Sequence, residues 1–265
     1  MPSTSEKGHV QNVNSLDLLI KTCQGFSTKY NPSRAALKIA NLQILYTAND
    51  GSLTTITNKL RTYNNVVNDR RVFFAPAKKL ATKVLNALKA SAPTAQILED
   101  AKGINRKIQG TRAAKIDDAP PADTSATTPG DTSTYISVSQ QSYVSIADRF
   151  NEYNTLLKTV ANYAPNEVEL QTATLTIFTT GLKTNNTNVN TATVDIQNAR
   201  IARNVVMYKE ETGLYDIAQA VKDYVKSIYG ATSVEYKQVS KIKFTPLPKP
   251  KAASKPKTTA KTTKK

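Results

Sequence analysis

The stretch YNPSRAALKIANLQILYTANDG, residues 30–51, has a counterpart in YAPNEVELQTATLTIFTTGLKT, residues 163–184. Each stretch opens with the pattern Y-x-P and continues with apolar residues at steps of three and four. One constant offset in residue number pairs the identical residues of the two, which are Tyr30 with Tyr163, Pro32 with Pro165, Leu37 with Leu170, Ala40 with Ala173, Leu42 with Leu175 and Ile44 with Ile177. The sequence therefore predicts an internal duplication.

The similarity continues beyond these stretches. The same offset pairs Asn65 with Asn198, Arg70 with Arg203 and Val72 with Val205. After a small gap, Val84 lies opposite Val221, Leu88 opposite Val225 and Lys89 opposite Lys226. Because the matches cover so long a stretch, we expect a unit of several helices to have been copied.

A long helix is expected in each copy, because the apolar spacing persists for about 40 residues. The turn-like residues NDGS at 49–52 leave the apolar phase unchanged, and the second copy has no turn there. We therefore predict one continuous helix, weakened by about 1 kcal/mol at Gly51. Pro32 and Pro165 are expected near its first position, where the fixed φ of proline is tolerated.

The remaining helices give an all-α fold of two tandem homologous helical-bundle units. First helices are expected over about 10–28 and 140–160, third helices over 76–90 and 212–229, and fourth helices over 93–107 and from 232. The predicted boundaries are a basic first unit at 1–112, a disordered linker at 113–135, a near-neutral second unit at 136–244 and a disordered lysine-rich tail at 245–265. Both expected disordered segments are rich in polar residues and proline and poor in the apolar residues that a core needs.

The positive charge is concentrated in two regions. The net charge of the chain is +16. Residues 1–110 hold 16 Lys and Arg against 6 Asp and Glu, residues 141–240 hold 9 against 10, and residues 241–265 hold 9 lysines and no acid. A flexible polycation binds a polyanion by releasing condensed counterions, without reading a base sequence. This favours nucleic acid, or another polyanion, as a partner.

The candidate nucleic-acid-binding residues follow from these two regions. They are Lys249, Lys251, Lys255, Lys257, Lys261, Lys264 and Lys265 of the tail, with Arg71, Lys78, Lys79, Lys83, Arg106 and Lys107 of the first unit. For the second group, a solvated helix face that keeps the protein in solution is the alternative. Arg70 and Arg203 are expected to be structural, each guanidinium lying on a carbonyl or carboxylate of a neighbouring helix. A phosphate or partner contact is the alternative for this pair.

Enzymatic chemistry has little support in the sequence. Cys23 is the only cysteine and His9 the only histidine, so no zinc cluster can form. Neither a nucleophile motif nor a nucleotide-binding glycine motif is present. Cys23 shares an apolar helix face with Leu16 and Leu19, which predicts a buried packing thiol. We expect no enzyme, no metal, no cofactor and no small-molecule substrate.

The location is expected to be cytoplasmic. A single thiol suits a reducing compartment, and no apolar run is long enough to cross a membrane.

Four segments carry a resemblance to a known family: GHVQNV at 8–13, INRKIQG at 104–110, ISVSQQSY at 136–143 and the stretch from ETGLYDI at 211 to KIKF at 244. Together they resemble an uncharacterised family of bacterial cytoplasmic helical proteins with an internal duplication. The resemblance implies a helical architecture and no assigned activity.

Two functions remain open at this stage. The first is sequence-independent binding or compaction of nucleic acid by the tail and the basic first unit. The alternative is a structural or scaffolding protein that self-associates through its long helices, as coiled coils do, and forms a homo-oligomer.

Overall fold

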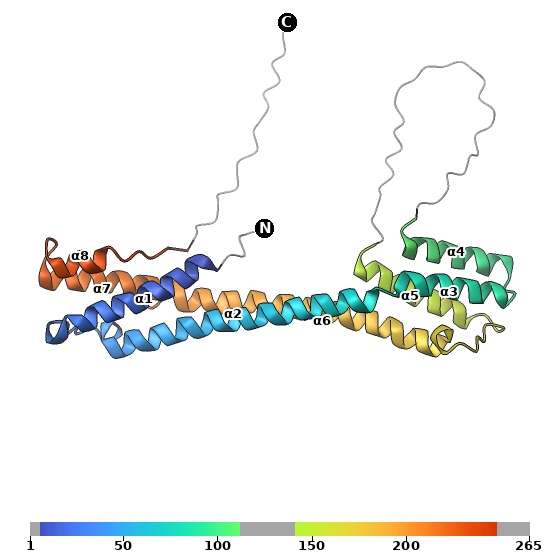
Figure 1. Ribbon diagram of the computed structural model, residues 1–265, viewed down its shortest axis with the longest axis horizontal. Helices are drawn as coiled ribbons and strands as arrows, with labels where there is room; N and C mark the ends of the chain where they lie inside the picture. Colours follow the sequence, from blue (N-terminus) through green and yellow to red (C-terminus); the bar gives the residue numbers. More distant parts are fainter. Residues whose placement is uncertain (1–5, 112–140, 248–265) are drawn as a thin grey trace, which may run out of the picture. The chain divides into compact units, whose positions relative to one another are not determined.

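The computed structural model describes residues 6–111 and 141–247, and every regular element in those ranges is helical (Figure 1). The α-helices are α1 (Lys7–Gly25), α2 (Ile39–Phe74), α3 (Ala77–Ala90), α4 (Ala95–Gln109), α5 (Tyr143–Lys158), α6 (Thr172–Tyr208), α7 (Leu214–Tyr229) and α8 (Val234–Ser240). Short 3-10 turns lie at η1 (Ser27–Lys29), η2 (Ala35–Leu37) and η3 (Val168–Leu170). The prediction of an all-α fold is confirmed. The expected linker and most of the expected tail lie outside the described residues.

The two long helices are continuous, α2 over 36 residues and α6 over 37. α2 passes through Asn49–Ser52 without a break, as predicted. Asn49 faces the core there and donates its amide to the carbonyl of Leu45 at 2.8 Å. The apolar phase read from the sequence is also confirmed, because Leu42 and Ile56 of α2 are buried at that spacing.

The long helices begin later than the prolines suggest. α2 begins at Ile39 and α6 at Thr172, which the offset of the repeat also pairs, and each follows a 3-10 turn. The Tyr30 hydroxyl donates to the carbonyl of Leu37 at 2.7 Å, and the Tyr163 hydroxyl donates to that of Leu170 at 2.8 Å. These bonds use the last carbonyl of each turn, so the prolines lie in a connecting loop and not in the helix.

Two compact units are present, and their composition differs from the expected boundaries. Unit 1 comprises residues 1–58 and 197–265, and unit 2 comprises residues 59–196. In unit 1, α1 packs on α7 and α8; in unit 2, α3 packs on α4 and α5 (Figure 1). Each unit thus joins the first helix of one copy to the third helix of the other. This exchange arises because α2 and α6 each place their first part in one unit and their last part in the other.

The exchange redistributes the charge. Among the described residues, unit 1 holds 13 Lys and Arg against 8 Asp and Glu, and unit 2 holds 14 against 8. The expected contrast between a basic unit and a near-neutral unit is therefore absent from the described parts of the two units. The net charge therefore does not favour either unit as the one that binds an anion.

The cores of the two units use equivalent positions. In unit 1, Leu16, Leu19 and Cys23 of α1 are buried; in unit 2 their counterparts in the repeat, Phe150, Tyr153 and Leu157 of α5, are buried. Burial raises the pKa of the Cys23 thiol to about 12, although a hydrogen bond with Tyr30 lowers it. The prediction of a buried packing thiol is confirmed.

Two helical glycines give a matched test of this packing. A Cβ added at Gly181 of α6 would lie 2.3 Å from Cζ of Phe73, whose ring stacks on Phe178, whereas a Cβ at Gly51 of α2 meets nothing within 4 Å. Gly51→Ala is expected to stabilise unit 1 by up to about 1 kcal/mol through helix propensity. Gly181→Ala is expected to destabilise unit 2 by about 1–2 kcal/mol through overpacking. Urea unfolding of both variants measures the difference; equal stabilisation at the two sites would contradict the Phe73 packing.

Candidate nucleic-acid interface

Cationic side chains from two helices are brought together at one end of unit 2. The ammonium of Lys78, in the first turn of α3, donates to the carbonyl of Gln109 at 3.1 Å, and the Gln109 amide donates to the carbonyl of Lys78 at 2.7 Å. These two bonds join the first turn of α3 to the last turn of α4. Lys78 therefore lies at the end of α4, whose last turn holds Arg106 and Lys107, whereas Lys79 lines a surface hollow with Lys83 and Glu169. We call the six residues Arg70, Arg71, Lys78, Lys79, Arg106 and Lys107 the basic end of unit 2.

The charges of the basic end form no ion pair in the part of the chain that the structure describes, although Glu99, Asp100 and Glu152 line a hollow with Arg106 and Lys107. Within residues 6–111 and 141–247, no carboxylate forms an ion pair with any of the six side chains. The Lys78 ammonium donates to a neutral carbonyl group. Four of the six, Arg71, Lys78, Lys79 and Arg106, are exposed. Within the described ranges, these four exposed side chains have no carboxylate partner and are accessible to an external anion.

The dipole of α3 does not account for Lys78 and Lys79, although the Lys78 ammonium does bond the last carbonyl of α4. The amino end of a helix carries partial positive charge, so cations there are unfavourable and anions are favoured. The first turn of α3 nevertheless holds two lysines and no acid. Arg106 and Lys107, in the last turn of α4, do complement the dipole of their own helix. The amino end of α3 thus adds to the attraction for an anion.

Lys83 was predicted with this group, but a carboxylate of unit 2 pairs with it. Its ammonium forms an ion pair with Glu169 at 2.7 Å, beside the 3-10 turn before α6. It is one helical turn beyond Lys79 and is neutralised by an acid of the same unit. Six residues between Arg71 and Lys107 were predicted from the sequence to bind nucleic acid. Five of them are in the basic end of unit 2, and Lys83 is not. The seven tail lysines lie outside the described residues.

Arg70 is the half-buried member of the basic end. Its guanidinium carbon lies 4.1 Å from the centre of the Tyr143 ring, and its Nε is buried without a hydrogen-bond acceptor. Tyr143 is held by Phe74, edge to face at 4.8 Å, and by Asn186, whose amide donates to its carbonyl at 3.1 Å. The predicted contact of Arg70 with a carbonyl or carboxylate is not found among the described residues; the arginine stacks on an aromatic ring instead.

Arg203, its partner in the repeat, does match the prediction. Arg203 is 5% exposed, forms an ion pair with Glu6 and donates to the Asn204 side chain at 2.8 Å. His9 lies in the same cluster, with Nδ1 3.0 Å from the hydroxyl oxygen of Tyr208. Burial, followed by the charge of Arg203, lowers the pKa of His9, while Glu6 acts in the opposite direction. This cluster is internally satisfied, which suits a structural role.

The segment that leads into the lysine tail is anchored in unit 1. Asn12 of α1 is fully buried and bonds both backbone groups of Thr245: its amide donates to the carbonyl at 2.9 Å, and its oxygen accepts from the N–H at 2.7 Å. The Lys222 ammonium donates to the carbonyl of Ile242 at 2.5 Å and lies 5.0 Å from the Phe244 ring centre. Sequence reasoning missed Asn12, although it falls one turn before Leu16 on the apolar face of α1.

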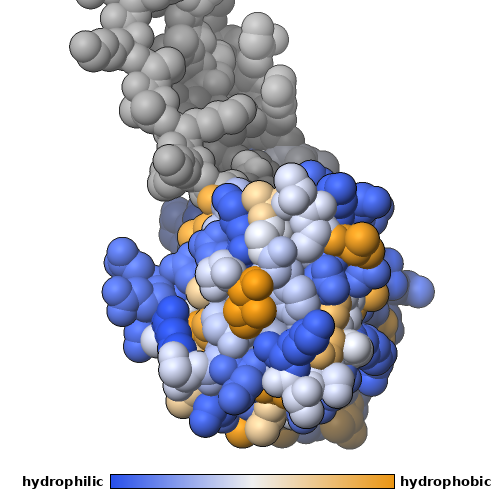
Figure 2. Space-filling model, turned by 90° about the vertical axis from the view of Figure 1, so that its left-hand side faces the viewer, coloured by the Kyte–Doolittle hydropathy of each residue, from blue (hydrophilic) through white to orange (hydrophobic). Residues whose placement is uncertain are grey.

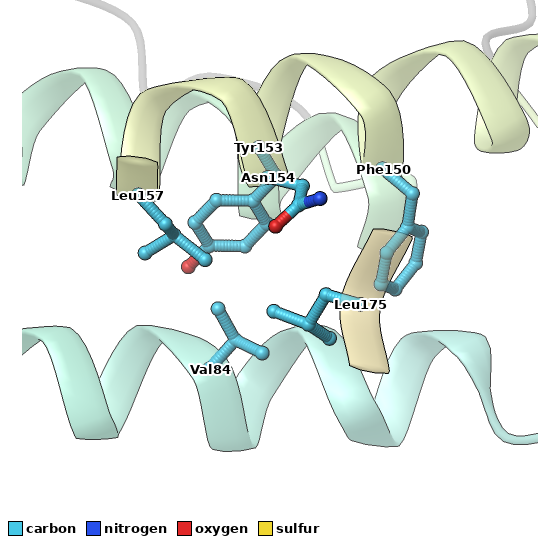
Figure 3. A pocket seen from close by; sticks show the side chains of 6 residues that line it. All are labelled: Val84, Phe150, Tyr153, Asn154, Leu157 and Leu175. Carbon is cyan, nitrogen blue, oxygen red and sulfur yellow. The ribbon is translucent and has the colours of Figure 1, made fainter. Parts of the chain in front are cut away.

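The small pocket of Figure 3 shows packing and not a ligand site. Val84, Phe150, Tyr153, Asn154, Leu157 and Leu175 line it, and their side chains converge from three helices. The hydroxyl of Tyr153 has no hydrogen-bond partner there, and burial raises the pKa of this phenol. Its counterpart in unit 1 is Leu19, which needs no partner.

Tyr153→Phe is therefore expected to leave unit 2 equally stable or more stable, by up to about 1 kcal/mol, because it removes an unsatisfied buried hydroxyl. Tyr163→Phe is the matched control. That change removes the bond to Leu170 and should cost about 1 kcal/mol. Thermal unfolding of both variants measures the change in stability. A loss of stability in Tyr153→Phe as large as that in Tyr163→Phe would show that the Tyr153 hydroxyl has a partner.

Metal and membrane sites can be assessed for the described part of the chain. Across residues 6–111 and 141–247, no three His, Cys, Asp or Glu side chains are grouped as metal ligands. In the same ranges no helix is long and apolar enough to span a membrane.

Comparison with known proteins adds no further assignment: no protein-family model, no curated protein and no solved structure matches the chain. The resemblance to an uncharacterised bacterial family therefore stays an expectation.

Proposed function

We propose that this protein binds nucleic acid without sequence preference, through the basic end of unit 2 and the lysine-rich tail. The observation that carries the proposal is the joining of α3 to α4 through Lys78 and Gln109, which brings cations that are distant in sequence to one end of unit 2. Within the described ranges these cations form no ion pair with a carboxylate. Phosphate contacts by such side chains release counterions and give affinity without base readout. The role is binding and not catalysis.

The setting we propose is a cytoplasmic protein of the bacterial helical family that the sequence resembles, with a duplicated unit. The equivalent starts of α2 and α6 and the equivalent hydrogen bonds of Tyr30 and Tyr163 support the duplication. A lone buried thiol suits a reducing compartment.

The binding experiment measures fluorescence anisotropy of a labelled 20-base-pair DNA at several salt concentrations. The full chain is expected to bind at 50 mM salt, with affinity falling steeply as salt rises. Replacing Lys78, Lys79, Arg106 and Lys107 together with glutamine should reduce the salt slope by about 3 to 4, because each lost phosphate contact removes about 0.9.

A charge-matched variant controls for net charge. Lys38, Lys89, Lys158 and Lys183 are exposed and lie outside the basic end, so replacing these four with glutamine should change the slope much less. A chain that ends at Leu247 measures the share of the tail. No binding by the full chain at low salt, or equal losses in the two quadruple variants, would reject the proposed interface.

Self-association through the long helices is a second candidate function, favoured by one observation. Ile44 and Ile177, equivalent in the repeat, are 67% and 73% exposed, and the equivalent Val72 and Val205 are 68% and 52% exposed. On the face that Figure 2 shows, by contrast, hydrophobic side chains stand singly among hydrophilic ones. Contiguous exposed apolar patches mark interaction surfaces, and these four residues are the candidates for contacts between copies of the chain.

Light scattering tests this candidate function. An oligomer that survives 0.5 M salt and is lost in the variant with Ile44→Ser and Ile177→Ser would support it. A monomer at all concentrations would reject it.

A further inference from the structure

The surroundings of the repeated arginine differ between the two units in whether a carboxylate of the protein is present. In unit 1 two carboxylates occupy these positions. Glu6 pairs with Arg203, and Asp216 in the first turn of α7 accepts a hydrogen bond from the N–H of Glu211 at 2.9 Å. At the equivalent end of unit 2, Arg70 replaces Arg203. Lys79 replaces Asp216, by the offset that aligns buried Val84 with buried Val221.

The position of Glu6 has no acidic counterpart in unit 2. The offset that relates Leu16 of α1 to Phe150 of α5 also pairs His9 with Tyr143 and Glu6 with Gln140. His9 and Tyr143 each lie near the repeated arginine. The charge of Arg203 lowers the pKa of His9, and the guanidinium of Arg70 stacks on the Tyr143 ring. The sequence at this position therefore keeps the aromatic neighbour of the arginine but replaces the acid by an uncharged amide.

The geometry of Arg70 leaves donors for an anion. Stacking on Tyr143 uses a face of the guanidinium, whereas its five N–H groups lie in the plane of the group. Nε is buried without an acceptor, and no hydrogen bond or ion pair of Arg70 occurs in the described ranges. An unpaired buried N–H is unfavourable, and a planar guanidinium edge fits a phosphate through two parallel hydrogen bonds.

We propose that Arg70 is a phosphate seat, in which a backbone phosphate of the bound nucleic acid takes the place that the Glu6 carboxylate has in unit 1. This inference rests on the proposed function and assigns it one defined contact. Arg71 follows Arg70 in α2, and Lys78 and Lys79 lie in the first turn of α3, which begins shortly after α2 ends. Neighbouring phosphates of the same strand would meet them.

The direct test observes the arginine side chains by ¹⁵N NMR while inorganic phosphate, dimethyl phosphate or chloride is added to the full chain. The Nε–H signal of Arg70 is expected to shift and saturate with both phosphates and not with chloride at equal ionic strength. The Nε–H signal of Arg203, already paired with Glu6, is the internal control and should stay in place. No saturable shift at Arg70 would overturn the inference.

Variants connect the seat to nucleic-acid binding. Arg70→Gln is expected to weaken DNA binding about ten-fold, as for the loss of a charge-assisted hydrogen-bonded contact. Arg61→Gln, an exposed change of the same charge in the same helix, should weaken it about two-fold or less. Arg70→Lys keeps the charge but not the bidentate geometry, so it should lose most of the ten-fold in DNA affinity.

The outcomes separate the seat from the proposed function. DNA binding by the full chain with no response at Arg70, or with equal losses in Arg70→Gln and Arg61→Gln, would reject the seat and leave the proposed function standing. A phosphate response at Arg70 without DNA binding would support the seat and reject the proposed function. Melting curves check that each variant is folded. If Arg70→Gln does not fold, the NMR titration of the unmodified chain tests the seat by itself.

Discussion

Replacing Asn12 with alanine is expected to lower the free energy of unfolding of unit 1 by about 2–3 kcal/mol, because a cavity forms and several hydrogen bonds are lost. Asn12 is fully buried, and its side chain bonds the N–H and the carbonyl of Thr245 and donates to the hydroxyl of Tyr208. Each partly buried group that loses its partner costs about 1 kcal/mol or more. Urea denaturation followed by circular dichroism measures the loss.

Asn14→Ala is the matched control for this experiment. Asn14 is exposed on the opposite face of α1, so its loss should change stability by less than about 0.5 kcal/mol. Hydrogen exchange of the Thr245 amide gives a second readout, because this amide should lose protection in Asn12→Ala. Equal stability of the two variants, with Thr245 still protected, would contradict the anchoring of residues 241–247.

Replacing Glu6 with glutamine is expected to destabilise unit 1 by about 2–4 kcal/mol, because removing one partner of a buried ion pair leaves an uncompensated charge. Glu6 pairs with Arg203, whose side chain is 6% exposed, and also lies 3.4 Å from Arg200. Such a loss is among the most costly single changes. Thermal unfolding in a buffer without phosphate measures the effect.

Added phosphate tests the reason for that loss. In Glu6→Gln the guanidinium of Arg203 keeps its bonds to Asn204 but loses its paired carboxylate, so phosphate at about 10 mM should recover part of the melting temperature through binding to the folded state. Glu210→Gln, an exposed change of the same charge in unit 1, should neither lower the melting temperature comparably nor respond to phosphate. A Glu6→Gln variant as stable as Glu210→Gln would show that the ion pair contributes little.

The sequence was sufficient for the elements but not for their partners. Apolar spacing predicted the continuity of α2 through Gly51 and the buried phase of both long helices, because periodicity reports which face of a helix is covered. It does not report what covers that face. The exchange of first and third helices between the copies depends on where the long helices cross from unit 1 to unit 2, and no local pattern contains that information.

The candidate site shows the same limit. Composition identified Lys78, Lys79, Arg106 and Lys107 as basic, but Gln109, which joins their helices, is an ordinary polar residue in the sequence. The repeat paired Arg70 with Arg203 correctly as equivalent positions. Their different roles follow from Glu6, a residue that precedes the matched stretch and has no acidic counterpart in the second copy.

Lysine footprinting tests the central claim most directly. The full chain is acetylated with and without a saturating 20-base-pair DNA at 50 mM salt, and the modification of each lysine is measured by mass spectrometry. The account predicts strong protection of Lys78, Lys79 and Lys107 and of the tail lysines, with Lys21, Lys89 and Lys158 modified as before. Uniform weak protection of all lysines, or protection of the tail lysines alone, would contradict a nucleic-acid interface at the basic end of unit 2.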